Sequence, residues 1–247
     1  MAATAAAMHH GVIKSVTSGD TVVVMGVDAS KGPPPEKLLS LSGIAAPRLG
    51  NKSTPDQPHG WEAREWLRRR AVGKRVTFQV DAQGAANRAF GVVYMEDGAS
   101  LACECVKAGW AKARTGGPAE LTAAGTAAEA AGVGMYSPSA KASAVREVKW
   151  AGTFDASELL STLKGTPQDA IIEQMPSGST LRVLLLPTFH QITLMLSGIQ
   201  CAAIRRNEDG TEDAQPFARE ARYFVESRLL HRDVQVMCQA LALPSRP

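Results

Sequence analysis

The sequence predicts an α+β fold made of two copies of one small closed β-barrel with helical additions, of which the second copy is truncated. The first observation is a hairpin over residues 11–27, in which two β-branched runs flank a Ser-Gly-Asp-Thr turn at 18–21. The second is the return of that turn as Ser-Gly-Ser-Thr at 177–180, again followed by an apolar run. Recurrence of one supersecondary unit at a fixed period is typical of duplicated domains.

The third observation is that the offset between the copies stays nearly constant along the chain. It is 159 between the turns that begin at 18 and 177, and 155 between the Leu-Ser-Gly-Ile phrases that begin at 41 and 196. It is 158 between the strands around 76 and 234. Offset changes this small are expected in loops, so the whole second half is expected to repeat the first.

The elements of the first copy follow from local patterns. After the hairpin, three prolines at 33–35 require an exposed loop, and the apolar run at 38–44 predicts a third strand. The pattern at 61–72 predicts a helix that ends at Gly73, and the alternation of apolar residues at 75–80 predicts a strand. Further elements are expected as a strand at 89–95, helices at 101–107 and 120–131, and a strand remnant at 111–115. Five strands with a helix inserted after the third indicate a barrel of the oligonucleotide-binding type.

The chain is expected to divide into four segments. These are a disordered tail at 1–10, a first domain at 11–138, a linker with a short helix at 139–166 and a partial second domain at 167–247. The second domain is expected to hold strands at 170–173, 181–186, 191–199 and 233–239 and a helix at 217–230. Because it has no counterpart of the last strands of the first copy, we expect a fragment of a longer protein or a gene prediction that ends early.

Composition narrows the class of protein. The net charge of +3 and a sequence pI near 8.7 suit a polyanionic partner without requiring one. No apolar run approaches the roughly 20 residues needed to span a bilayer, and the start of the chain lacks the features of a secretory signal. The four cysteines show no metal-ligand spacing, which favours reduced thiols in the cytosol. The expected location is therefore cytoplasmic, with the nucleus as a second site, and no membrane or small-molecule substrate is expected.

Several phrases in both copies resemble the Tudor staphylococcal nuclease family. In the first copy these are Gly-Val-Ile-Lys at 11–14, Gly-Pro-Pro-Pro-Glu at 32–36 and Ala-Arg-Glu at 63–65. In the second copy they include Met-Leu-Ser-Gly-Ile at 195–199 and Glu-Ser-Arg-Leu-Leu at 226–230. The resemblance covers about residues 10–240. It implies the nuclease-like barrel fold, and a parent with four such repeats followed by a Tudor domain fused to a fifth.

The resemblance also implies where a calcium-dependent nuclease site would lie. Asp20 matches the aspartate that ligates calcium, and is the candidate catalytic and metal-binding residue. The other four functional positions are occupied by Ser40, Ala45, Arg48 and Phe90, with Arg88 as a substitute for the arginine missing at the last of them. Calcium requires about 6–8 oxygen ligands, so a single carboxylate predicts a vestigial site at best. The alternative is that Asp20 is only a turn residue.

The second copy predicts no better site. Its four comparable positions carry Ser179, Met195, Gln200 and Ala203. None of these is a carboxylate, so neither copy is expected to be an efficient nuclease of the staphylococcal kind.

A cluster of cations predicts where nucleic acid would bind. Residues 60–75 carry six basic residues against Glu62 and Glu65, with Trp61 and Trp66 between them as candidates for base stacking. The candidate nucleic-acid-binding residues are Arg64, Arg68, Arg69, Arg70, Lys74, Arg75 and Arg88. The alternative is a solvated helix face with the tryptophans in the core.

Two functions of different classes follow. The first is an RNA-binding scaffold of a silencing complex, with RNA and silencing-complex proteins as the partners that the resemblance implies. The second is a weak calcium-dependent endoribonuclease that uses Asp20, because the family is associated with cleavage of small and edited RNAs. The residues leave open whether the chain is an enzyme.

Overall fold

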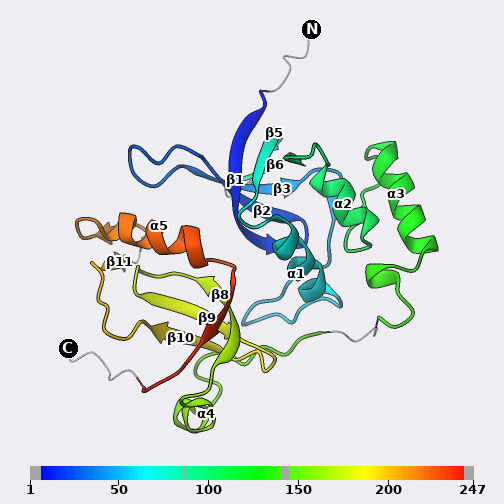
Figure 1. The fold of residues 1–247 in the computed structure, drawn as a ribbon. Coiled ribbons are helices and arrows are strands. Elements are labelled where there is room, and N and C mark those ends of the chain that lie inside the picture. The colour runs from blue at the N-terminus through cyan, green and yellow to red at the C-terminus, as the bar shows by residue number, and fades with distance from the viewer. Residues whose placement is uncertain (1–6, 86, 141–144, 208, 242–247) are drawn as a thin grey trace. The chain divides into compact units, whose positions relative to one another are not determined.

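The structure is a computed structural model that describes residues 7–85, 87–140, 145–207 and 209–241 (Figure 1). It divides into two compact units, residues 1–146 and 147–247, which we call the first and second unit. Among the described residues, no helix combines the length and the apolar character needed to cross a bilayer.

The first unit is built on a closed five-stranded barrel, which confirms the fold class. Its strands are β1 (His9–Ser18), β2 (Thr21–Met25), β3 (Glu36–Leu41), β5 (Arg75–Gln83) and β6 (Arg88–Met95). They follow one another around the barrel in the order β1-β2-β3-β6-β5. All neighbours are antiparallel except β3 and β6, which run parallel.

The start of β1 corrects the expected tail at 1–10. The strand begins at His9, which pairs with Phe78, and His10 pairs with Thr77. Polar residues join the strand here because β5 offers a backbone edge, and a backbone pairing needs no apolar side chain. Residues 7–8 have no regular secondary structure, and residues 1–6 lie outside the described residues.

The helices of the first unit are α1 (Gly60–Ala71), α2 (Leu101–Lys107), α3 (Ala119–Ala130) and a 3₁₀ turn at Gly134–Tyr136. Two of them pack on the barrel, α1 on β1 and α2 on β6, and α3 packs on α2 (Figure 1). Gly73 has a φ of +80°, so it ends α1 in the left-handed conformation that its position predicted. Buried Leu39, Leu67 and Leu101 show that strands, α1 and α2 share one core.

The expected third strand at 38–44 is broken in two. β3 ends at Leu41, and the short strand β4 (Ile44–Ala45) pairs instead with β7 (Lys112–Ala113). Gly43 lies between them with a φ of +79°. Because only glycine adopts this conformation readily, the chain turns here and leaves the barrel.

The second unit holds an open sheet in place of a closed barrel. Its strands β8 (Gln168–Gln174), β9 (Thr180–Leu185), β10 (Gln191–Met195) and β13 (Asp233–Val236) lie in the order β10-β9-β8-β13. They correspond to β3, β2, β1 and β5 of the first unit, and α5 (Ala218–Leu229) corresponds to α1. The expected strands at 191–199 and 233–239 both end early. The end of β10 follows the break in the first unit, where β3 stops at Leu41 before Gly43, and the matching Gly198 also has a positive φ of +73°. The residues that match 237–239 are paired with β6 in the first unit, and the described residues of the second unit include no equivalent strand.

Two further elements complete the second unit. The short helix α4 (Ala156–Leu163) agrees with the helix expected in the linker. The strands β11 (Ile204–Arg206) and β12 (Glu212–Ala214) form a small separate hairpin that the sequence did not predict. Its mostly polar residues carry no alternating pattern, so only the backbone pairing identifies it.

Candidate functional site

The turn between β1 and β2 holds Asp20 by hydrogen bonds to its own surroundings. The Asp20 Oδ1 atom accepts from Ser18 Oγ at 2.7 Å and from Thr21 Oγ1 at 3.0 Å. The Oδ2 atom accepts from the backbone N–H of Ala46 at 3.1 Å. Both carboxylate oxygens therefore stabilise the turn and connect it to the loop after β4.

The sequence places a glycine before Asp20 because the turn packs closely. A Cβ atom on Gly19 would lie 2.8 Å from the Cβ atoms of both Ala46 and Ala63. The turn thus touches the β4 loop and α1 at once. Real Cβ contacts are not this short, so a larger residue would push the turn off α1.

The second unit repeats this arrangement without a carboxylate. Ser179 stands in the position of Asp20, and its Oγ accepts from the backbone N–H of Cys201 at 3.3 Å. A Cβ atom on Gly178 would lie 2.9 Å from the Cys201 Sγ and 3.1 Å from the Cβ atom of Ala221. The two copies therefore share a hydrogen bond that the turn side chain accepts from a backbone N–H of the following loop.

The other positions of the implied nuclease site supply no further anionic ligand. The Ser40 and Thr21 hydroxyls lie 3.0 Å apart. Because the single Thr21 proton points to Asp20, Ser40 is the donor in that pair. Ala45 has no ligand atom on its side chain, and Arg48 is an exposed cation. Phe90 pairs with Ser40 across β6 and β3.

A thiol beneath the turn adds no ligand either. Burial raises the pKa of the Cys105 thiol, and the nearby Asp20 and Glu104 carboxylates raise it further. A protonated thiol is a poor metal ligand. Cys103, Cys105, Cys201 and Cys238 are all free thiols.

The structure corrects the interpretation of Arg64 and Arg68 as part of an exposed basic face. Their side chains are only 3% exposed, and both bond to Glu65, which is also buried. Arg68 contacts both Glu65 carboxylate oxygens at 2.8–3.0 Å. Arg64 also donates from Nε to the carbonyl oxygen of Val16 at 3.2 Å, which ties α1 to β1. These two cations therefore serve the internal structure of the first unit.

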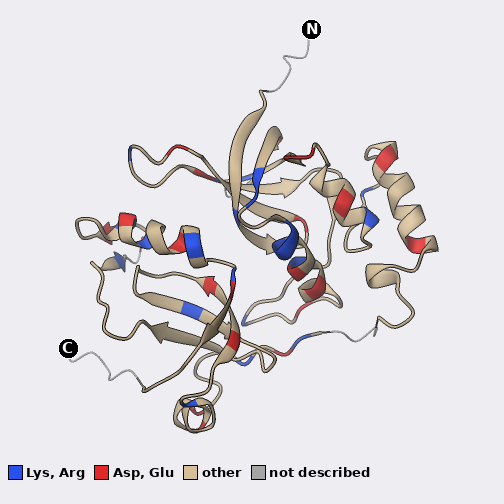
Figure 2. Cartoon of the chain, in the orientation of Figure 1, with Lys and Arg blue, Asp and Glu red and all other residues tan. Residues whose placement is uncertain are grey.

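The remaining candidate cations fall into separate groups. Arg70 donates to Glu104 at 2.8 Å, and this hydrogen bond raises the pKa of the Arg70 guanidinium. Arg69, Lys74 and Arg75 are exposed, and they lie at the end of α1 and the start of β5, where Figure 2 shows blue segments close together. Arg88 is exposed at the opposite end of the β5–β6 pair. Arg75 begins β5, and Gln83, eight residues later on the same strand, pairs with the residue next to Arg88. At about 3.3 Å per residue along a strand, Arg75 and Arg88 therefore lie roughly 25 Å apart.

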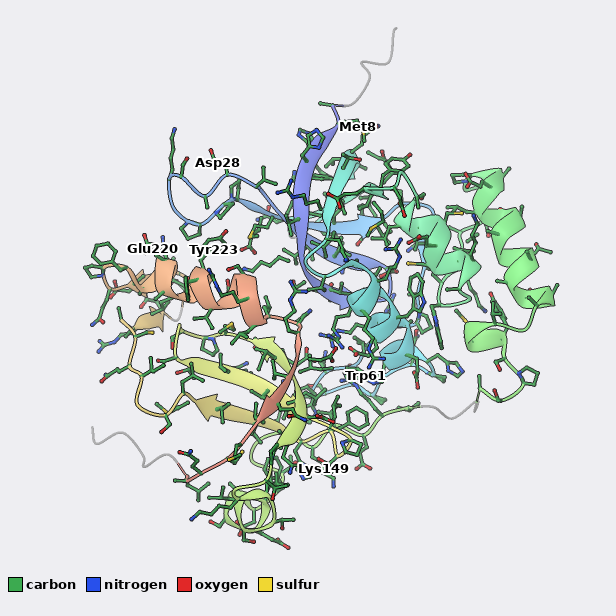
Figure 3. All side chains as sticks on the ribbon, in the orientation of Figure 1. Met8, Asp28, Trp61, Lys149, Glu220 and Tyr223 are labelled. Atoms are coloured by element: carbon green, nitrogen blue, oxygen red, sulfur yellow. The ribbon has the colours of Figure 1, made fainter. Side chains whose placement is uncertain are left out.

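The two tryptophans of α1 have different surroundings. Trp66 is partly buried and packs on the core of the first unit. Trp61, labelled in Figure 3, carries the Arg64 guanidinium 5.4 Å from its ring centroid and that of Arg146 at 4.3 Å. Arg146 is in turn bonded to Asp56 at 2.7 Å. Cations already cover the ring of Trp61, so it is less available for base stacking than its sequence position predicted.

Comparison with known proteins agrees with this architecture. Residues 38–138 match the family described as Staphylococcal nuclease homologue. Over 94% of its length the chain is 42% identical to Staphylococcal nuclease domain-containing protein 1 of Drosophila melanogaster. Over the same share it is 33% identical to Ribonuclease TUDOR 2 of Arabidopsis thaliana. The chain belongs to the Tudor staphylococcal nuclease family. It spans 27% and 29% of the length of these two relatives.

Nuclease domains of the staphylococcal type generally depend on calcium, and the residues of this Tudor staphylococcal nuclease chain fit that ion poorly. The described residues contain no group of three or more His, Cys, Asp or Glu side chains that could hold a metal ion. At the turn itself, both oxygens of the Asp20 carboxylate already accept hydrogen bonds. These three hydrogen bonds already use most of the acceptor positions of the one carboxylate at the turn, and calcium needs about 6–8 oxygen ligands, so we derive no metal-dependent step from this site.

We expect Asp20 to matter for stability more than for metal binding. Replacing it with Ala removes an acceptor of three hydrogen bonds and should lower the free energy of unfolding by about 1–3 kcal/mol. Asp20→Ser should cost less, because Ser179 shows that a hydroxyl can hold the equivalent loop. Urea unfolding of both variants, with and without calcium, checks this. Calcium-induced stabilisation that disappears in Asp20→Ser would instead show that Asp20 binds the metal.

Proposed function

We propose that this chain is an RNA-binding scaffold module of a Tudor staphylococcal nuclease-type protein, with a largely degraded nuclease site. The observation that carries the proposal is the state of Asp20: its carboxylate stabilises a turn, and the second unit fills the same role with Ser179. The first unit keeps the barrel, but the single carboxylate at the implied nuclease site stabilises a turn. Such a unit is better suited to binding RNA than to cleaving it.

The exposed cations of the first unit support binding to a polyanion. Arg69, Lys74 and Arg75 lie within seven positions of one another, across the end of α1 and the start of β5. Such cations contact phosphates without regard to base sequence. The matching helix of the second unit is weaker in this respect, because its Arg222 bonds to Glu212 at 3.0 Å. We therefore assign most of the RNA affinity to the first unit.

The partners and location belong to the same proposal. The family resemblance and the name of the plant relative, Ribonuclease TUDOR 2, support RNA as the ligand. We place the module in the cytoplasm, and also in the nucleus, within a silencing complex whose other proteins contact the barrels. The resemblance supports this placement.

The competing function is a weak calcium-dependent endoribonuclease that uses Asp20. It is favoured by the position of Asp20 at the turn that the nuclease pattern requires and by the names of the relatives. The two functions differ in one observable, which is whether RNA is cut.

The test incubates the chain and its Asp20→Ala variant with labelled single- and double-stranded RNA, with calcium or with a chelator. We expect intact RNA whose mobility shifts less at higher salt, because counterion release drives phosphate binding. Calcium-dependent products that vanish in Asp20→Ala would overturn the scaffold proposal in favour of the nuclease.

The basic surface is tested by a triple variant, Arg69→Ala with Lys74→Ala and Arg75→Ala. If all three contact phosphate, the salt dependence of single-stranded RNA binding should fall by a slope of about 2, or roughly 0.7 per contact. The matched control removes three exposed lysines elsewhere in the first unit, Lys31, Lys52 and Lys112, and thus changes the net charge equally. Equal weakening by both variants would mean that net charge, and no particular surface, attracts the RNA.

A further inference from the structure

In the first unit, β5 and β6 lie side by side in the barrel and share one outer face (Figure 1). Every second residue of β6 is buried in the barrel, and these are Ala89, Gly91, Val93 and Met95. Val76 and Phe78 of β5 are buried in the same way. Because side chains alternate between the two faces of a strand, the residues that alternate with them point outward. We call these the β5–β6 face, and they are Arg75, Thr77, Gln79, Arg88, Phe90, Val92 and Tyr94.

The β5–β6 face holds the two aromatic rings of the barrel strands that are not part of the core. Phe90 and Tyr94 are both partly exposed, whereas Phe78 on the inner face of β5 is only 8% exposed. The sequences of β1, β2 and β3 contain no Phe, Tyr or Trp. At about 3.3 Å per residue, Phe90 and Tyr94 are attached roughly 13 Å apart along β6. Outward-pointing rings are therefore confined to one face of the barrel strands.

Both rings lack the cations that cover Trp61. Two guanidinium groups lie over the ring of Trp61, but in the described part of the chain no ring or guanidinium stacks on Phe90 or Tyr94. A Cβ atom on Gly84 would lie 2.9 Å from Phe90 Cε2, so the glycine in the turn between β5 and β6 makes room for that ring. Partly exposed rings without a stacking partner are the platforms on which unpaired bases bind.

An exposed cation stands at each end of the β5–β6 face. Arg75 begins β5 two residues before Thr77, which pairs with Tyr94, and Arg88 begins β6 two residues before Phe90. The residues between the two arginines on this face are uncharged. The carboxylates nearest along the strands are Asp81, which accepts a hydrogen bond from Ser42 Oγ at 2.7 Å, and Glu96, which follows β6. A polyanion that contacts both arginines therefore has to pass over the aromatic rings.

We propose that the β5–β6 face binds single-stranded RNA along the direction of the strands, with phosphates on Arg75 and Arg88 and unpaired bases on Phe90 and Tyr94. This inference rests on the proposed RNA binding and specifies the form of RNA and the surface that takes it. Only a single strand can offer the flat sides of its bases to a protein ring, because the bases of a duplex are stacked on one another. The span of roughly 25 Å suits the lower part of the range of about 4–16 nucleotides that barrels of this type bind.

The experiment measures, by fluorescence anisotropy, the binding of a labelled RNA of about 12 nucleotides, either single-stranded or as a duplex. The variants are Phe90→Leu and Tyr94→Leu, which keep an apolar side chain on β6 but remove the ring. We expect each to weaken single-strand binding by at least about 5-fold, because a base loses its stacking partner, and to leave duplex binding unchanged. The salt dependence should stay the same in both, since no phosphate contact is removed. Arg88→Ala should instead lower the salt slope by roughly 0.7.

The matched control is Tyr136→Leu, because Tyr136 is a partly exposed ring in the 3₁₀ turn, outside the β5–β6 face. Urea unfolding checks that every variant is folded under the binding conditions. Unchanged single-strand binding by Phe90→Leu and Tyr94→Leu, an equal loss in Tyr136→Leu, or an equal loss of duplex binding would overturn this inference while RNA binding by the chain still stands. Failure of the unmodified chain to bind either RNA would instead overturn the proposed function, and the inference with it, so the two failures are distinguishable.

Discussion

Replacing Glu65 with Ala is expected to destabilise the first unit by about 3–5 kcal/mol, the usual cost of breaking a buried ion pair by removing one partner. Glu65 is buried and accepts hydrogen bonds from both Arg64 and Arg68, whose side chains are 3% exposed. Without the Glu65 carboxylate, the guanidinium charges of Arg64 and Arg68 would remain buried and would lose the anion that both of them contact. Urea unfolding followed by tryptophan fluorescence measures the change, since Trp61 and Trp66 lie in the same helix.

The control for this prediction is a neighbour on the same helix. Arg69 is 68% exposed and lies 4.0 Å from the same carboxylate. Exposed pairs of this kind contribute little, so Arg69→Ala should leave the unfolding midpoint nearly unchanged. If Glu65→Ala were as mild as Arg69→Ala, water would have to reach the two buried arginines, and their assignment as structural residues would be wrong.

Replacing Gly91 with Ala is expected to cost more than about 4 kcal/mol, which is exceptional for the addition of one methyl group. A Cβ atom on Gly91 would lie 2.1 Å from the carbonyl oxygen of Gln79 and 3.1 Å from Leu39 Cδ1. Gly91 lies on β6, the strand that closes the barrel by joining β3 to β5. The backbone of β5 cannot yield without opening this pairing, so the first unit should unfold at much lower urea.

A second glycine provides the matched substitution. Gly125 lies inside α3, and a Cβ atom there would meet Val106 Cγ1 at 3.5 Å, an ordinary contact. Gly125→Ala should therefore stabilise the first unit by up to about 1 kcal/mol, because alanine favours the helix. The same chemical change is thus expected to have opposite signs at the two sites. Similar unfolding midpoints for both variants would mean that β6 is not clamped between its neighbours as the structure places it.

Local patterns in the sequence were enough to predict most of the first unit. Val76 and Phe78 alternate along β5 and are buried in the core, because alternation in a strand sends every second side chain to one face. Gly73 ended α1 as its position predicted. The duplication was also visible, since turns and strands recur at a nearly constant offset, and the second unit repeats β1, β2, β3, α1 and β5 in order.

The charged residues were harder to assign from sequence. A run of arginines at 68–70 indicated an exposed face, yet Arg68 is buried while Arg69 is exposed. One sequence signal was available: Glu65 lies one position after Arg64 and three before Arg68, within reach of both. Helical spacing shows which residues share a face, but only packing against β1 decides that this face points inward.

By itself, the sequence determined most elements of the first unit and their duplication in the second, because each of these depends on residues near one another in the chain or on a match by position. Tertiary structure alone decided three things: that Asp20 holds the β4 loop, that Arg88 lies far from Arg75, and that β10 and β13 border an apolar groove. These depend on contacts between segments distant in sequence. The way the sheet closes sets which segments meet in these contacts, and no local sequence pattern encodes that closure.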